Sequence, residues 1–457
     1  MNILMTGATG LIGKEIGKLL VSQGHELTVL TRNTNEAQSS LPFPARLVEW
    51  KHYNNPLSPE VFNEIDSVIH LAGESIASGR WSNKRKKEIL ESRQLGTRNL
   101  VNAIMASSGR VKQFISASAI GIYGDTQNEV DENSSQANDF LAKVCVAWED
   151  EAKKLKQKSV KVINPRIGIV LSRHGGAMEK MLPLFSLGIG GVIGSGKQWM
   201  SWIHIEDLAQ MFVHFVNNPN LEGAYNAVAP EPATNKVFSK TLAKALGKNL
   251  FIPVPSIALK IGLGEMSKLV TGGQKVSSKK IQGTNFQFKF ASLVSALNEI
   301  CSPLTKGQKE ALYEIWLPNK VSEIFPFFSD EKNLEVLTPK HLKFQVLKKS
   351  TPDMQKGTLI DYRLNLYGIP LKWRTLIESW QVNKQFTDEQ LKGPYKKWHH
   401  THEFIEFAGG TLMRDRVHYK MPFGLLGEAI TGPLVKSDVN KIFSYRRRVI
   451  AKIFTSK

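Results

Sequence analysis

The sequence predicts an α/β protein in two parts, a doubly wound parallel sheet with a small substrate lobe followed by an α+β unit. From Met1 to about Ala227, short apolar runs alternate with amphipathic segments, the rhythm of strand–helix–strand units. Beyond Cys301, apolar and polar residues alternate, which is typical of antiparallel strands with one covered face. The buried strands of the first part are expected at residues 3–5, 27–30, 68–71, 114–115 and 160–163.

The second part is predicted to contain strands at residues 342–346 and 360–366 and a long terminal helix from Pro433 to Phe454. Apolar residues recur at helical spacing along that helix, and Arg446-Arg447-Arg448 lies off the apolar stripe. A Pro/Gly-punctuated linker at residues 302–307 separates the parts. We therefore expect residues 1–301 and 308–457 to fold as separate domains.

Composition indicates a globular cytoplasmic protein. Cys145 and Cys301 are too few for a disulfide framework, and Met1 leads into a strand-like run, not an export signal. No uncharged stretch is long enough to predict a transmembrane helix. The excess of 60 basic over 41 acidic residues is interpreted as lysine-rich surface, because no basic cluster is interleaved with the aromatic residues that nucleic-acid grooves use. Nucleic acid is not an expected partner.

A glycine-rich turn follows the first predicted strand. Gly7, Gly10 and Gly13 stand three residues apart and lead into a predicted helix. The first glycine permits the tight turn, the second a close approach of pyrophosphate, and the third close packing of helix on strand. This turn is typical of a Rossmann dinucleotide site, although a glycine turn without a ligand has the same composition. The predicted contacts in the turn are Gly7, Thr9, Gly10, Leu11, Ile12 and Gly13.

The end of the second predicted strand favours NADP(H) over NAD(H). It reads Thr31-Arg32-Asn33, without the carboxylate that would hold a ribose 2′-hydroxyl. Arg32 can pair with a 2′-phosphate instead, or it is an ordinary surface arginine. The turn Leu71-Ala72-Gly73, after the strand at 68–71, has small residues that let backbone approach a dinucleotide.

Residues 1–301 resemble the atypical extended short-chain dehydrogenase/reductases known as epimerase family proteins, of the NAD-dependent epimerase/dehydratase-like superfamily. The resemblance is carried by Thr6 to Gly13, His70 to Glu74, Arg80-Trp81, Ser92-Arg93, Pro165-Arg166, Gly175 to Ala177, Gly194 to Gln198 and Trp202 to Asp207. It implies that Thr31, Arg32, Leu71, Ala72, Glu88, Arg93 and Val170 also lie against the cofactor.

The reductases and epimerases of that superfamily use a Tyr-x-x-x-Lys pair, which this chain lacks. Where the pair is expected, Asp139 stands four residues before Lys143. Ser118, at a strand end, is a candidate for polarising a substrate carbonyl, or is a hydroxyl that binds backbone. Ser118, Lys143 and Asp139 are therefore the candidate catalytic residues, with Asp139 a proton carrier only if burial raises its pKa.

No metal site is predicted. His400 and His402 would share a strand face with Glu406, but no spacing of a known tight site is present. These histidines are expected as polar lining of a cavity.

From about Gly307 the chain resembles the helix-grip superfamily of START-like, polyketide-cyclase and coenzyme-Q-binding proteins. The order strand, two short helices, several strands and one long helix carries this resemblance, with residues 386–390 and Gly393-Pro394 in the middle. It implies a cavity for an apolar small molecule, lipid or quinone, with peripheral membrane contact through Arg446 to Arg448. The rings proposed for its walls, or for an ordinary core, are Trp373, Trp380, Trp398, Phe404 and Phe407.

Two functions remain open. The first is an NADP(H)-dependent oxidoreductase or isomerase whose helix-grip part binds or delivers an apolar substrate of unknown identity. It is favoured by the retained segments at 175–198 and 202–207. The second is a non-catalytic NADP(H)-sensing regulator, favoured by the missing Tyr-x-x-x-Lys pair; the resemblance extends to relatives linked to cell division.

Overall fold

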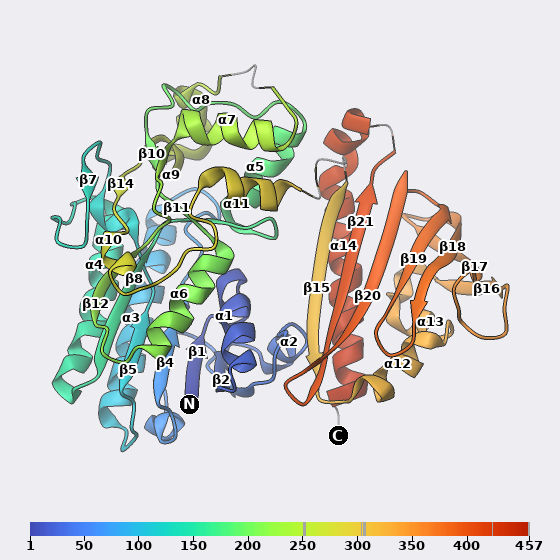
Figure 1. Ribbon diagram of the computed structural model, residues 1–457, viewed down its shortest axis with the longest axis horizontal. Helices are drawn as coiled ribbons and strands as arrows, with labels where there is room; N and C mark the ends of the chain where they lie inside the picture. The colour runs from blue at the N-terminus through green and yellow to red at the C-terminus, as the bar shows by residue number, and fades with distance from the viewer. Residues whose placement is uncertain (250–252, 303, 305–307, 423, 456–457) are drawn as a thin grey trace. The chain divides into compact units, whose positions relative to one another are not determined.

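The computed structural model describes residues 1–249, 253–302, 304, 308–422 and 424–455. The chain forms two compact units (Figure 1). Unit 1 comprises residues 1–33 and 45–302, and unit 2 comprises 34–44 and 303–457. Most of the predicted linker at 302–307 lies outside the described residues. The stretch Thr34–Pro44, which the sequence analysis placed in the first domain, groups with unit 2.

Unit 1 is built on a parallel sheet with strand order β3-β2-β1-β4-β5-β8-β12. The order reverses between β1 and β4, and the crevice at such a reversal is where doubly wound sheets bind ligands. The strands β1, β4 and β5 are almost fully buried, as expected where helices cover both faces. The strands are β1 Asn2–Thr6, β2 Glu26–Thr31, β3 Arg46–Glu49, β4 Ser67–His70, β5 Gln113–Ser116, β8 Lys161–Ile167 and β12 Gly223–Ala227.

The helices of unit 1 form two layers. Helices α1 (Leu11–Ser22) and α6 (Ile205–Asn217) pack together, as do α3 (Asn83–Ala106) and α4 (Phe140–Lys153) (Figure 1). The predicted small lobe contains α5 (Gly176–Ser186), α7 (Asn235–Ala245), α8 (Ser256–Leu263) and α11 (Leu293–Cys301). The short elements are β6 Ser118–Ala119, β7 Glu129–Val130, β9 Ile169–Leu171, β10 Trp199–Met200, β11 Trp202–His204, β13 Ala233–Thr234, β14 Lys275–Val276, α9 Lys268–Thr271 and α10 Lys279–Gln282.

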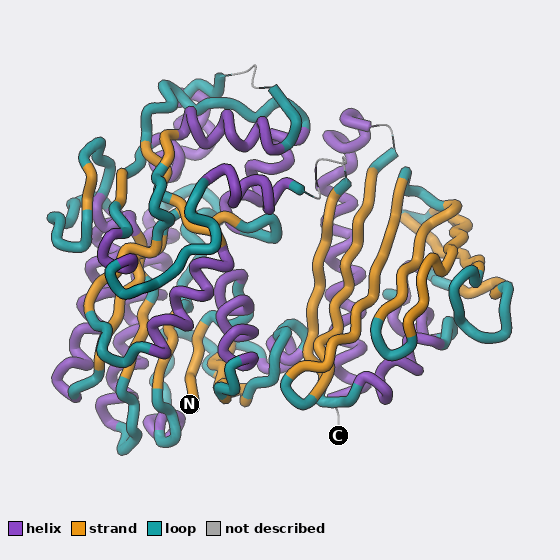
Figure 2. The backbone as a smooth tube through the Cα atoms, in the orientation of Figure 1, coloured by secondary structure: helices purple, strands orange, loops and turns teal. Residues whose placement is uncertain are grey.

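Unit 2 is mostly an antiparallel sheet (Figure 2). Its strand order is β15-β21-β20-β19-β18-β17-β16. Two apolar clusters join the sheet to helix α14 (Gly424–Thr455): Ile450 packs with Phe404 and Met413, and Phe443 stacks on Tyr313. The remaining elements are α2 Thr34–Gln38, β15 Lys309–Leu317, α12 Val321–Ser329, α13 Asn333–Leu337, β16 Gln345–Lys349, β17 Leu359–Leu366, β18 Ile369–Gln381, β19 Gln385–Lys392, β20 Lys397–Phe407 and β21 Gly410–Lys420.

Two predicted boundaries in unit 2 are wrong. Helix α14 begins at Gly424, so Pro433 lies inside the helix and does not start it. A proline removes one backbone hydrogen bond, which a long packed helix tolerates. The strand predicted at 342–346 begins only at Gln345, because Leu342 ends a 3₁₀ turn and Lys343 follows it with a left-handed φ of 44°. None of the described helices has the length and apolar character needed to span a membrane.

Candidate functional site

The turn between β1 and α1 has no room for side chains at its glycines. Gly7 has a φ of 71°, and a Cβ there would lie 2.9 Å from the carbonyl carbon of Leu71. A Cβ on Gly13 would lie 2.4 Å from the Gly7 oxygen and 2.6 Å from the Cα of Ala8. Gly10 precedes α1 and makes no side-chain cap, so N–H groups of the first helical turn remain available to an anion.

The end of β4 is fixed beside this turn. The Thr6 hydroxyl oxygen accepts hydrogen bonds from the backbone of Leu71 (3.2 Å) and Ala72 (3.1 Å). It also bonds to His70, 2.7 Å from Nδ1, and the other ring nitrogen of His70 bonds to Thr97 at 3.1 Å. Burial, with a smaller contribution from Arg93, lowers the pKa of His70 to about 3, so the imidazole is neutral. The predicted turn 71–73 therefore lies directly against the glycine turn.

Arg93 on α3 closes the next side of the site. A Cβ on Gly73 would lie 3.0 Å from the guanidinium carbon of Arg93. That guanidinium donates to the carbonyls of Glu74 (3.0 Å) and Ile89 (3.2 Å) and lies 5.0 Å from the centre of the Trp148 ring. Arg93 therefore lies directly beside the turn 71–73.

Arg32 lies at the end of β2 with a side chain that is 80% exposed. Its guanidinium is 3.7 Å from Glu74, a long ion pair that leaves its donors accessible. Glu74 is also held by Arg85 at 3.2 Å, and Arg85 binds Glu88 at 3.0 Å. Glu88, which the resemblance placed against the cofactor, is thus paired within this group of charges. The hydroxyl of Thr31 donates to the carbonyl of Asn33 at 3.2 Å.

Strand β9 and the start of α5 form the remaining side of the candidate cofactor site. A Cβ on Gly176 would lie 3.6 Å from the carbonyl oxygen of Val170, and one on Gly175 would lie 3.1 Å from the side chain of Leu11. Two buried polar atoms nearby, Ser116 Oγ and Trp148 Nε1, lack a hydrogen-bond partner among the described residues. Ser116 is paired with His70 across β4 and β5, and Trp148 contacts the His70 ring. The tight glycines and these unpaired donors fit a bound dinucleotide.

The three candidate catalytic residues differ in their exposure and hydrogen-bond partners. The Ser118 hydroxyl donates to Glu149 at 2.8 Å in a buried network. Glu149 makes a two-point ion pair with Arg166, with distances of 2.9 and 3.0 Å. Arg166 also donates to the Tyr123 oxygen at 2.9 Å, and burial raises the pKa of Tyr123 to about 12. The Ser118 hydroxyl is therefore already engaged.

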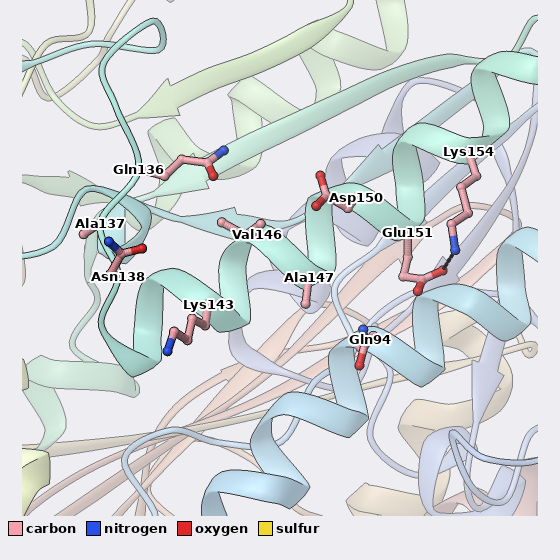
Figure 3. A pocket seen from close by; sticks show the side chains of 10 residues that line it. All are labelled: Gln94, Gln136, Ala137, Asn138, Lys143, Val146, Ala147, Asp150, Glu151 and Lys154. Carbon is pink, nitrogen blue, oxygen red and sulfur yellow. Dashed lines mark hydrogen bonds and ion pairs between the residues drawn. The ribbon is translucent and has the colours of Figure 1, made fainter.

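Asp139 and Lys143 lie at the start of α4. Asp139 is the N-cap of α4, accepting from the backbone of Ala142 at 2.9 Å. Lys143 is exposed and lines a hollow of about 480 Å³, together with Gln94, Gln136 and Asp150 (Figure 3). Ser118 does not line this hollow. A helix cap explains why an aspartate stands where a catalytic tyrosine was expected.

Sequence reasoning missed Glu149 and Thr97. Arg166 and His70 appeared only as members of family motifs, with no partner assigned. Glu149 pairs with Arg166 because α4 packs on β8, and Thr97 reaches His70 from α3. No local pattern in the sequence indicates such pairs.

Comparisons with known proteins match unit 1 to two family models and to curated relatives. A family model described as the NAD dependent epimerase/dehydratase family matches residues 3–228, and a second, a domain of unknown function (DUF1731), matches 254–300. Epimerase family protein YfhF of Bacillus subtilis is 36% identical over 304 residues, covering 66% of this chain and 98% of the relative.

Two solved structures are similar to unit 1. The human epimerase family protein SDR39U1 (isoform2), solved with NADPH, is 34% identical with a TM-score of 0.60, over 66% of this chain and 99% of the other. A nucleoside-diphosphate sugar epimerase from Corynebacterium glutamicum is 28% identical with a TM-score of 0.53, over 65% of this chain and 57% of the other. The chain therefore belongs to the epimerase family proteins, within the NAD dependent epimerase/dehydratase family.

Proposed function

We propose that unit 1 binds NADP(H) and is an oxidoreductase-like or epimerase-like protein acting on a small molecule. The observation that carries the cofactor assignment is Arg32, an exposed guanidinium at the end of β2 where no carboxylate stands. Its long contact with Glu74 is easily exchanged for a 2′-phosphate, which accepts charge-assisted hydrogen bonds. The NADPH of the human relative supports the same choice.

Substitution of Arg32 tests the preference for NADP(H). A charge-assisted phosphate contact contributes about 1.5 to 3 kcal/mol, so NADPH should bind at least about tenfold tighter than NADH. Arg32→Ala should remove most of the difference, measured by calorimetry with both nucleotides. Arg110→Ala is the matched control, since Arg110 is also exposed and ion-paired, but with Asp66. Equal affinities for the two nucleotides in the unaltered protein would contradict the proposal.

The structure also offers support for the second function, a non-catalytic NADP(H)-sensing regulator. Ser118 and Asp139 have structural partners, and the retained motif 202–207 has structural contacts as well. In that motif Asp207 accepts from the backbone of Lys289 and Phe290. Mass spectrometry of metabolites retained by the purified protein separates the two functions: an enzyme should retain a substrate or product besides the nucleotide.

For unit 2 we propose a helix-grip-like role, the binding of an apolar or amphipathic molecule between the sheet and α14. The Trp373 ring lies 5.9 Å from Tyr362, 5.8 Å from Tyr395 and 5.7 Å from Trp398, measured between ring centres. Its buried indole N–H lacks a partner among the described residues, which suits a ligand with a carbonyl or carboxylate oxygen. Trp380 and Phe404, in contrast, belong to the packed core around Phe325.

The burial of this segment speaks against the expected membrane contact through Arg446 to Arg448, because Arg446 is buried and only Arg448 is exposed.

Titration of the full chain with a fluorescent fatty-acid or quinone probe tests the ligand class. Trp373→Phe keeps an aromatic ring, although a smaller one, and removes the N–H, so it should weaken binding of the probe. Binding of labelled DNA or RNA that is lost with added salt, without probe uptake, would overturn the proposal.

A further inference from the structure

A cluster of two histidines and two aspartates lies on one face of the unit 2 sheet. His400 and His402 are alternate residues of β20, so their side chains point to the same face. Asp388 on β19 is directly opposite His400, and Asp415 on β21 is directly opposite His402. The sheet register therefore brings four ionisable groups from three neighbouring strands together. Both histidines are buried, at 5% and 3% exposure.

Three of these groups have the arrangement of metal ligands. One oxygen of Asp388 lies 3.4 Å from Nδ1 of His400 and 3.1 Å from Nε2 of His402. The candidate ligand atoms of the three residues lie within 4.8 Å of one another. Tetrahedral bonds of about 2.0 to 2.1 Å place neighbouring ligands about 3.4 Å apart, close to these separations.

Asp415 contacts the far nitrogen of each imidazole. Nε2 of His400 donates to Asp415 at 3.1 Å, and Nδ1 of His402 is 2.6 Å from the same oxygen. Metal-bound histidines usually donate their second N–H to such a carboxylate. With both protons directed to Asp415, the free nitrogens of His400 and His402 face the Asp388 oxygen. Three acceptors then converge, an arrangement that a cation stabilises.

Without a metal, a neutral His402 leaves two acceptors in contact. If Nε2 of His402 donates to Asp388 and Nδ1 accepts from Arg446 at 3.3 Å, Nδ1 is still 2.6 Å from the Asp415 oxygen, as two acceptors in contact. A doubly protonated His402 would satisfy both carboxylates without a metal, and zinc titration distinguishes that form from a cation site.

We propose that Asp388, His400 and His402 bind a divalent transition-metal ion of the zinc class, with Asp415 orienting both imidazoles. Two histidines and one carboxylate suit Zn²⁺ and leave a fourth position open. Glu406, the carboxylate first considered with these histidines, is exposed instead. The sequence did not predict the site because its carboxylates come from neighbouring strands. The proposal is independent of the NADP(H) site.

Zinc titration of the full chain, after removal of metal with a chelator, tests the site. We expect one saturable Zn²⁺ per chain and, with Co²⁺ as the probe, the visible absorption of a low-symmetry site. Asp388→Asn and His402→Ala should abolish saturable binding, and Asp415→Asn should weaken it by about 10- to 100-fold. His399→Ala is the matched control, since His399 is the neighbour in β20 that pairs with Glu378 on the sheet.

Two outcomes would overturn the proposal. One is the absence of saturable Zn²⁺ or Co²⁺ binding by the unaltered chain. This measurement does not depend on the folding of any variant. The other is zinc binding of equal affinity in Asp388→Asn and His399→Ala, provided both variants keep the unfolding transition of the unaltered protein.

Discussion

Asp139 caps the start of α4, at the position where the catalytic tyrosine of the superfamily was expected. Its carboxylate accepts the backbone N–H of Ala142 at 2.9 Å. Loss of such a cap costs about 1 kcal/mol, whereas asparagine and serine cap nearly as well. We expect Asp139→Ala to lower the free energy of unfolding by about 1 kcal/mol, and Asp139→Asn to leave it unchanged, as measured by urea unfolding.

The substitution Asp139→Asn also separates capping from proton transfer, because it keeps the cap and removes the ionisable group. NADPH affinity should be unchanged in both variants. Asp150→Ala, an exposed position later in the same helix, is the control for general effects of charge removal. A stable Asp139→Asn protein with lost NADPH binding or lost turnover would show that the carboxylate does more than cap.

At the scale of single residues, the sequence predicts those site residues whose requirement is local. Gly7 and Gly13 are needed by the turn itself, and Arg32 is recognised by its place after a strand. Glu149 and Asp388 could not be predicted in this way. Their partners are set by helix packing and by strand register, which the local pattern does not specify.

At the scale of elements, the interior strands of unit 1 were predictable and the edge strands were not. Strands β1, β4 and β5 are buried on both faces, which requires continuous apolar runs. Strands β3 and β12 lie at the two ends of the sheet, and β3, with sequence Arg-Leu-Val-Glu, is only partly buried. An edge strand has one neighbour, so its sequence is less apolar and is easily mistaken for a loop.

Helix α4 is tied to the sheet by charge as well as by apolar packing. Glu149 on α4 and Arg166 on β8 are nearly fully buried and make two hydrogen bonds. Ser118 and Tyr123 satisfy further polar atoms of this pair. A buried ion pair of this kind contributes little net stability, but removal of one partner leaves an uncompensated charge. The network therefore fixes the position of α4 relative to β8, and with it Trp148.

At the scale of the whole molecule, the folding of residues 1–301 and 308–457 as separate domains stays a prediction. The contacts of the stretch Thr34–Pro44 bear on it, because this stretch groups with unit 2. Within unit 2 the backbone of Trp316 donates to the carbonyl of Leu41 at 2.9 Å. Leu41 and Phe43 are 3% and 2% exposed, so loss of their partners uncovers apolar surface.

We therefore expect the fragment 1–301 to keep a folded parallel sheet but to lose protection at residues 34–44. Hydrogen–deuterium exchange measured by mass spectrometry compares the fragment with the full chain. Amides of the 34–44 stretch should exchange faster in the fragment, since the Leu41 carbonyl loses its bond to Trp316 and α2 loses its contact with α14. Peptides from α1, whose partners are in unit 1, serve as the internal control and should be equally protected in both. Equal protection of residues 34–44 in both forms would show that the stretch does not depend on residues 303–457. Loss of protection in α1 as well would show that residues 1–301 do not fold alone.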